Sequence, residues 1–163
     1  MPVTDVDKNP DALTMTITAE FEADADRLWQ LWADPRQLER WWGPPTHPST
    51  FVEHELTPGA RTTYFMTGPD GEKHHGQWRI EEVDPPHRLH IADDEVDDEG
   101  KPADGGPTGM TVTIAEAEGK ATMSVQTHFA DRESMEQTIE MGFEQGMIET
   151  LDKIDPLLGA ARA

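Results

Sequence analysis

Alternating apolar and polar residues predict the first strand of the protein. Five apolar residues alternate with threonines and a glutamate: Leu13, Met15, Ile17, Ala19 and Phe21. A period of two places these side chains on one face of a strand, and that face is expected to be buried. The preceding residues are polar and show no such pattern. We therefore expect a flexible leader over residues 1–11 and a single domain over residues 12–159.

A stripe of apolar residues spaced three or four apart predicts one long helix over residues 131–158. The stripe consists of Met135, Ile139, Phe143, Met147, Leu151, Ile154 and Leu158. The spacing matches 3.6 residues per turn. Asp131 is a suitable N-cap, and Pro156 indicates a kink or an early stop. Such a helix is roughly 35–40 Å long and needs a broad apolar surface, which a sheet supplies.

Two short helices and six more strands are expected between these two elements. The first helix follows Asp24 and ends at Ala33, and Asp34-Pro35 starts the second. The strand candidates are Phe51–Leu56, Arg61–Thr67, Lys73–Val83, Arg88–Glu95, Thr108–Glu116 and Ala121–Phe129. Short turns between consecutive strands favour an antiparallel sheet, and one sheet covered by a helix gives an α+β domain. The segments 43–45 and 96–107 are rich in Gly and Pro and are expected to be loops.

Charge and composition exclude several classes of partner and site. The chain carries 13 basic and 33 acidic residues, a net charge of −20, which disfavours nucleic acids and anionic membranes as partners. It has no cysteine, so neither a disulfide nor a thiolate site is available. No apolar run has the length of a membrane span, and the first ten residues lack the apolar segment of a signal peptide. We therefore expect a cytoplasmic protein.

Several short blocks, in order along the chain, are similar to those of a known family. They are Leu31-Trp32-Ala33-Asp34-Pro35, Leu38-Glu39-Arg40-Trp41-Trp42-Gly43-Pro44, and the segments 56–61, 66–71, 82–89 and 141–147. These blocks resemble bacterial START-like (SRPBCC) proteins related to the activator of heat-shock protein 90 ATPase. The resemblance implies the helix-grip fold, an α+β arrangement in which a curved seven-stranded antiparallel sheet, with two short helices, wraps a long C-terminal helix.

The resemblance also implies a cavity for a small hydrophobic ligand between sheet and helix. The residues expected to line it are Trp41, Trp42, Tyr64, Met66, Trp78, Ile91, Met110, Met123, Gly142, Phe143, Gly146 and Met147. Each type has an alternative role in the core. The two tryptophans close a ligand cavity or plug one end of the sheet, and the methionines adapt to a ligand or fill the core. The two glycines allow close helix packing or leave space.

The titratable residues give no catalytic motif. The histidines lack metal-ligand spacing, and the nucleophile and phosphate-binding motifs are absent, so neither a metal nor a cofactor is expected. His75, Glu82, Asp93 and His128 fall near predicted strand centres and are the candidates for a general acid or base. Asp93 extends the face of Leu89 and Ile91, which would turn it inward unless the strand has already ended.

Three functions remain open from the sequence. The first is the binding of a small apolar or amphipathic ligand, and the second is a cyclase- or hydrolase-like reaction in the same cavity. The third is a protein-interaction module, chaperone-associated or regulatory, acting as a monomer or homodimer. The eukaryotic co-chaperone binds its chaperone through an additional N-terminal domain. Only about eleven residues precede the first strand here, so a chaperone partner has no support in the sequence.

Overall fold

The computed structural model describes residues 3–42, 48–93 and 108–162, without the side chains of Asp93 and residues 159–162. Its helices are α1 (Ala25–Ala33), α2 (Pro35–Trp41), α3 (Arg132–Glu140), α4 (Phe143–Asp152) and α5 (Ile154–Arg162). Its strands are β1 (Val3–Asn9), β2 (Thr14–Phe21), β3 (Ser49–Glu53), β4 (Arg61–Thr67), β5 (Lys73–Asp84), β6 (Arg88–Asp93), β7 (Gly109–Ala117) and β8 (Lys120–His128). The predicted loops at 43–45 and 96–107 lie outside the described residues.

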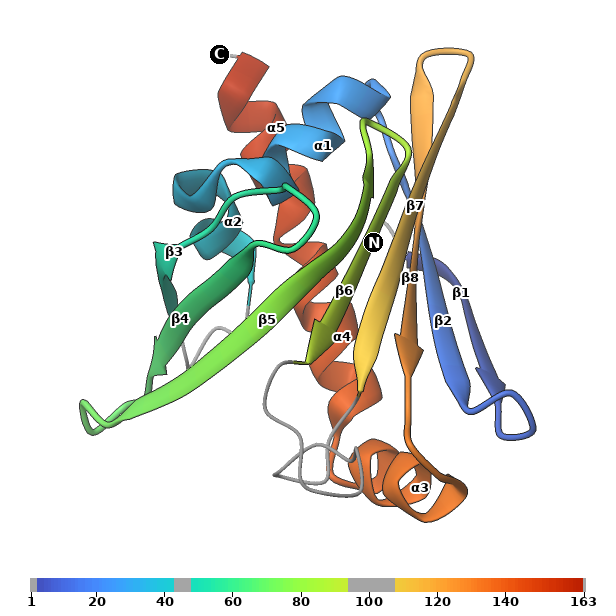
Figure 1. Ribbon diagram of the computed structural model, residues 1–163. Coiled ribbons are helices and arrows are strands. Elements are labelled where there is room, and N and C mark those ends of the chain that lie inside the picture. The colour runs from blue at the N-terminus through green and yellow to red at the C-terminus, as the bar shows by residue number, and fades with distance from the viewer. Residues whose placement is uncertain (1–2, 43–47, 94–107, 163) are drawn as a thin grey trace.

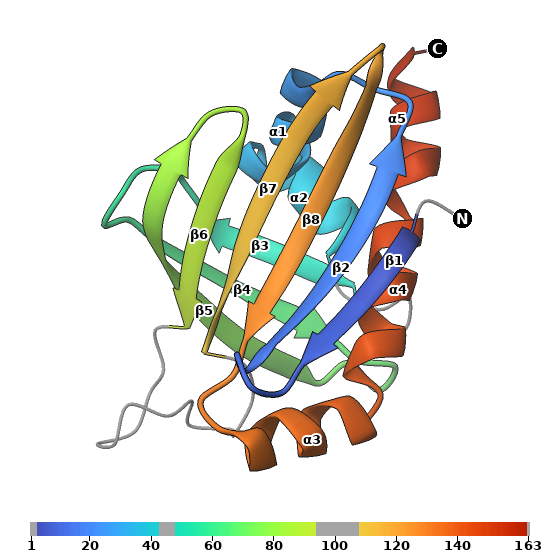
Figure 2. The same ribbon diagram turned by 90° about the vertical axis from the view of Figure 1, so that its right-hand side faces the viewer.

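All the described strands join in one curved, open antiparallel sheet, in the order β1-β2-β8-β7-β6-β5-β4-β3. Helices α4 and α5 run along its concave face, while α1 and α2 cover one end and α3 lies below the other (Figures 1 and 2). This is the helix-grip fold that the sequence predicts, with eight strands in place of seven. Within the described residues, no helix has both the length and the apolar character needed to cross a membrane.

The additional strand corrects the expectation of a flexible leader over residues 1–11. β1 pairs with β2 along its length, from Val3 opposite Ala19 to Asn9 opposite Thr14. Most of its side chains are exposed, as is typical of an edge strand that is paired on one side only. An edge strand of this kind has little alternation to recognise, and this explains why the sequence pattern misses it.

The predicted long helix is wrong as a single element, although its apolar stripe is confirmed. Gly142 has a left-handed backbone conformation, with φ of 97°, and separates α3 from α4. Figure 1 shows that α3 turns away from the axis of α4. A second break follows at Lys153, before α5. Five residues of the stripe are buried, namely Met135, Met147, Leu151, Ile154 and Leu158.

The helix starts follow the capping residues expected from the sequence. The side chains of Asp24, Asp34 and Asp131 accept hydrogen bonds from backbone N–H groups in the first turns of α1, α2 and α3. Pro35 occupies the start of α2, where no intrahelical donor is lost. These caps fix where α1 and α2 begin, and therefore where the tryptophans at the end of α2 lie.

Candidate functional site

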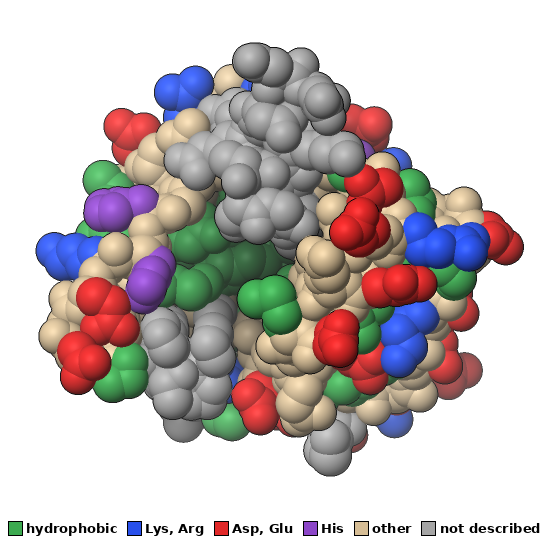
Figure 3. Space-filling view, turned by 90° about the horizontal axis from the view of Figure 1, so that it is seen from below, with side chains coloured by type: hydrophobic (Ala, Val, Ile, Leu, Met, Phe, Trp, Pro, Cys, Tyr) green, Lys and Arg blue, Asp and Glu red, His purple; other side chains and the backbone are tan. Residues whose placement is uncertain are grey.

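The concave face of the sheet is fully buried at one end and only half-buried at the other. On β7, Ile114 and Val112 are buried but Met110 is half-buried. On β4, Thr62 is buried, whereas Tyr64 and Met66 on the same face are half-buried. The core therefore thins toward the end of the sheet where β4 ends and β7 begins. Figure 3, which views the molecule from that end, shows a hollow lined by hydrophobic side chains.

Aromatic rings form a continuous wall from α1 and α2 to this half-buried part of the sheet. The Trp42 ring contacts Trp41 and Trp32 in edge-on arrangements, with centroids 5.7 and 5.9 Å away. Its other edge-on neighbour is Trp78 on β5, 5.0 Å away. Trp78 in turn contacts Tyr64 at 5.2 Å, and Tyr64 stacks on Phe51 at 5.0 Å. Such pairs stabilise each other beyond the area they bury.

The two adjacent tryptophans differ in how their indole N–H groups are satisfied. Trp41 is fully buried, and its Nε1 donates to the carbonyl oxygen of Leu31 at 3.0 Å. Trp42 is 8% exposed, and its Nε1 is buried without a hydrogen-bond partner. A buried donor left in this state costs about 1–3 kcal/mol. Trp41 thus has the character of a core residue, whereas Trp42 has an unused donor.

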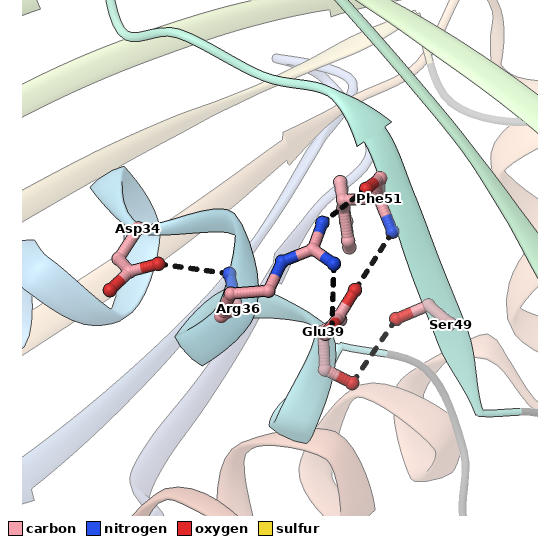
Figure 4. Close-up of polar contacts among 5 residues, drawn as sticks. All are labelled: Asp34, Arg36, Glu39, Ser49 and Phe51. Carbon is pink, nitrogen blue, oxygen red and sulfur yellow. Dashed lines mark hydrogen bonds and ion pairs between the residues drawn. The ribbon is translucent and has the colours of Figure 1, made fainter.

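Polar contacts between α2 and β3 hold the position of Trp42 (Figure 4). Glu39 accepts a hydrogen bond from the backbone N–H of Phe51 at 3.1 Å, and Arg36 donates to the Phe51 carbonyl at 2.6 Å. Ser49 Oγ donates to the carbonyl oxygen of Trp42 at 2.9 Å. These bonds fasten the end of α2 to the edge strand and so fix the position of the Trp42 backbone.

Gly76 on β5 gives the Tyr64 ring its place on the concave face. The two residues are paired across β4 and β5. A Cβ at Gly76 would lie 2.6 Å from the Tyr64 ring, which is closer than real Cβ contacts. The ring therefore lies over the glycine, and a side chain at position 76 would displace it.

On the helix side, the structure separates the two glycines that the sequence treats as a pair. Gly142 is exposed at the break before α4, while Gly146 is half-buried inside that helix. Apart from its chain neighbours and its own helix, no described residue has an atom within 4 Å of the position that a Gly146 Cβ would take. Close packing therefore does not explain Gly146. Open space lies beside it.

The direction of that space follows from an ion pair on the same helix. Glu144 of α4 binds Lys8 of β1 at 2.7 Å, so that flank of α4 faces β1. Gly146 is two residues further along, a rotation of about 200°. It therefore lies on the opposite flank, which faces the half of the sheet that carries the aromatic wall. Thr150 lies one turn further on this flank, is buried, and donates to the Gly146 carbonyl at 2.8 Å.

The other predicted lining residues have different environments. Phe143 is half-buried and contacts Phe129 edge-on, while Met147 and Trp78 are buried with slight exposure. Ile91 and Met123 lie in the closed part of the core. The Met123 sulfur accepts the Trp32 indole N–H at 3.2 Å, which assigns it a structural contact. Met66 and Met110 are half-buried at the thin end of the core.

The predicted acid–base candidates whose side chains the structure describes do not converge on the concave face. His75 pairs with Phe65 and is exposed on the convex face, because its neighbour Gly76 lies on the concave one. Glu82 is exposed and forms an ion pair with Arg88 at 3.0 Å. His128 lies on the convex side, where burial lowers its pKa, as does the nearby His90. The side chain of Asp93 lies outside the described residues.

His54 is a half-buried polar residue beside the site that the sequence analysis missed. Its Nε2 donates to the carbonyl oxygen of Trp32 at 2.6 Å, so its Nδ1 accepts from the Thr62 hydroxyl at 2.8 Å. Burial lowers the pKa of the imidazole, against a smaller opposing effect of the Trp32 carbonyl. Phe51, which stacks on Tyr64, was also missed as a site residue. The sequence marks both positions only as members of the strand candidate Phe51–Leu56.

No described group of three or more His, Asp or Glu side chains is arranged to hold a metal ion. The His90 and His128 rings meet on the convex face, where the Thr111 hydroxyl bridges them at 3.1 and 2.9 Å. The site is therefore an apolar hollow with hydroxyl groups beside the unused, buried indole donor of Trp42. Such a site suits the binding of a molecule better than acid–base chemistry.

Several known structures are similar to this chain. A crystal structure from Mycobacterium smegmatis is 44% identical, with a TM-score of 0.81, and the match covers 98% of this chain and 99% of that one. A solution NMR structure from Arthrobacter aurescens is 45% identical with a TM-score of 0.88, over 97% and 92% of the two chains. The AHSA1 protein of Silicibacter pomeroyi, at 18% identity and a TM-score of 0.66 over 91% and 99% of the chains, shares the fold.

A search of curated proteins gives no significant match. The model of the family described as "Activator of Hsp90 ATPase homolog 1-like protein" matches residues 22–159. That match runs from the residues before α1 into α5 and thus contains the aromatic wall, the hollow and the helix that borders it. The chain belongs to the Activator of Hsp90 ATPase homolog 1-like protein family.

Proposed function

We propose that the protein binds a small apolar or amphipathic molecule in the hollow between the concave face of the sheet and α4. The observation that carries this proposal is the open space beside Gly146. Glycine inside a helix costs about 1 kcal/mol relative to alanine, and here no packing contact compensates for it. Vacant space between a helix and an aromatic wall is the arrangement typical of small-molecule sites.

The lining residues proposed for this site are those that border the half-buried end of the core. They are Trp42, Tyr64, Met66, Trp78, Met110, Phe143, Gly146 and Met147. The aromatic rings offer rigid apolar surface, and the methionines adapt to ligands of irregular shape. Trp41, Ile91, Met123 and Gly142 are not proposed as lining, because the first three are closed in the core and Gly142 is exposed.

The two other functions have less support. An enzyme of cyclase or hydrolase type requires a convergent acid–base pair, and the described candidates lie on the convex face or on the surface. An interaction module requires an exposed apolar surface. The large hydrophobic side chains that the described part of the chain exposes are Val52 on an edge strand and Met141 at the helix break. The cytoplasmic location expected from the sequence remains a prediction.

The test compares two leucine substitutions on α4. Gly146→Leu would place an apolar side chain in the open space, whereas Gln145→Leu adds the same side chain at an exposed neighbouring position. Binding of a neutral naphthalene-type fluorescent probe is measured by titration, and folding is checked by urea unfolding. We expect Gly146→Leu to weaken probe binding at least tenfold and Gln145→Leu to change it less than twofold.

Two results would overturn the proposal. One is that the wild type binds no apolar probe and yields no molecule in native mass spectrometry. The other is that Gly146→Leu, while folded, binds the probe as tightly as the wild type. In that second case the probe would lie elsewhere on the molecule.

A further inference from the structure

Trp42 has a buried indole N–H that is left without an acceptor among the described residues. Trp32 donates to the Met123 sulfur and Trp41 donates to the Leu31 carbonyl, but Trp42 Nε1 has no partner. The nitrogen is also shielded from water, because Trp42 is more than nine-tenths buried. A buried indole usually finds a partner. The missing acceptor at this position therefore has to be explained.

The Trp42 ring belongs to the aromatic wall of the candidate site. The Trp42 ring contacts Trp78, and Trp78 is on the concave face beside Tyr64. The Trp42 backbone is held by Ser49 and by the bonds between α2 and β3, so the Trp42 ring is not a mobile surface group. A molecule bound against this aromatic wall would lie beside the Trp42 ring, whose buried N–H has no partner among the described residues.

We propose that the bound molecule carries an uncharged hydrogen-bond acceptor, such as a carbonyl or ether oxygen, and that Trp42 Nε1 donates to it. This inference rests on the proposed function and adds the chemical class of the ligand. An indole N–H donates and does not accept, so a ligand that offers only donors would leave it unpaired.

The acceptor is neutral for electrostatic reasons. The protein carries a net charge of −20, which disfavours the approach of an anion. The ring neighbours of Trp42 are Trp32, Trp41 and Trp78, and none of them offers a positive charge to a carboxylate. An ionised group would lose its hydration in this apolar surrounding without a counter-charge. A ketone, ester or ether loses far less.

The experiment uses two probes of the same shape. 2-Acetylnaphthalene has a carbonyl oxygen where 2-isopropenylnaphthalene has a CH₂ group. Their affinities are measured for the wild type, for Trp42→Phe and for the control Trp29→Phe, which removes a buried tryptophan of α1 outside the ring contacts of the cluster. The affinities of the two probes are compared between the wild type and each variant. This comparison separates the loss of a hydrogen bond to the ketone from general effects of the substitution on packing. 2-Naphthoate serves as the anionic probe.

We expect Trp42→Phe to weaken binding of the ketone about fivefold to tenfold more than binding of the alkene, which corresponds to about 1–1.4 kcal/mol. Trp29→Phe should change both affinities equally. In the wild type, the Trp42 Hε1 resonance should move downfield with the ketone and much less with the alkene. This second measurement needs no variant and holds even if Trp42→Phe does not fold.

Each alternative result has a separate meaning. If neither neutral probe binds the wild type, the proposed ligand-binding function itself is overturned, and this inference with it. If both bind but Trp42→Phe weakens them equally and Hε1 does not respond to the ketone, the inference is overturned and ligand binding stands. If 2-naphthoate binds most tightly and depends on Trp42, the neutral class is overturned.

Discussion

Burial favours the neutral form of the His54 imidazole by lowering its pKa, and the two hydrogen-bond partners fix its tautomer. The Trp32 carbonyl requires a proton on Nε2, and the Thr62 hydroxyl donates to Nδ1. Protonation of Nδ1 would reverse the second bond, with the Thr62 hydroxyl oxygen accepting, and would place a charge in a partly buried position beside the Phe51 ring. Burial accordingly lowers the pKa of His54. One histidine thus connects α1, the β3–β4 connection and β4 beside the proposed site.

This arrangement predicts a pH-dependent contribution to stability. The unfolded imidazole binds a proton near pH 6.5, whereas the folded one resists it, so the contribution is present above about pH 6.5 and is lost as the pH falls through the folded pKa. We expect the stability difference between wild type and His54→Gln to shrink from pH 7.5 to 5.5, by at most about 1.4 kcal/mol per unit of pKa depression.

Urea unfolding at several pH values measures this difference. His128, whose pKa is also lowered, is present in both proteins, so its contribution cancels. A stability difference that stays constant over this range would contradict the neutral assignment of His54.

At the scale of elements, the C-terminal part of the chain is organised by Gly142 and Gly146. Gly142 is the left-handed residue that turns α3 away from α4, and Gly146 lies inside α4 with space beside it. The four-residue spacing makes them look equivalent in sequence. Their backbone conformations make them physical opposites, because only Gly142 needs the freedom of a residue without Cβ.

Alanine at the two positions should therefore change stability in opposite directions. Gly142→Ala forces a Cβ into a left-handed conformation and should destabilise by about 1–2 kcal/mol. Gly146→Ala meets no clash and improves helix propensity, so it should stabilise by up to about 1 kcal/mol. Urea unfolding of both variants measures this. Destabilisation by Gly146→Ala would indicate that its flank is closely packed, contrary to the structure.

At the scale of the whole molecule, electrostatics is dominated by repulsion among acidic residues. The net charge is −20, and the described ion pairs involve side chains that are mostly exposed, such as Arg132 with Asp11 and Lys120 with Glu20. Exposed pairs contribute little to stability. The excess of negative charge therefore opposes the compact state, with few strong attractions to offset it.

Added salt should stabilise this protein by screening that repulsion. The Debye length shortens from about 30 Å at 0.01 M to about 3 Å at 1 M salt, a range that spans the distances between surface charges. We expect the free energy of unfolding to rise on the order of 1 kcal/mol between 0.02 and 0.5 M NaCl. Thermal unfolding at a series of salt concentrations tests this. Unchanged or lower stability in high salt would show that the described ion pairs outweigh the repulsion.

The sequence by itself determined the elements with a strong local signal. Alternation located β2 and β4 through β8, turn residues separated them, and Asp24, Asp34 and Asp131 marked the helix starts. The period of the C-terminal stripe identified its buried side. These features depend on residues close together in the chain, whose preferences are local. Local signals also carried the family resemblance, and with it the curved sheet.

Only the tertiary structure decided which parts of these elements form a site. β1 exists because it adds to a free edge, and its own sequence gives little sign of it. Trp41 and Trp42 are adjacent residues of the same type, yet only the indole N–H of Trp41 has an acceptor. That acceptor is the carbonyl oxygen of Leu31, which is ten residues away in sequence and is brought close by the fold. Gly146 borders open space because of what α4 packs against. Acceptors and vacant space are supplied by distant parts of the chain, so no local pattern encodes them.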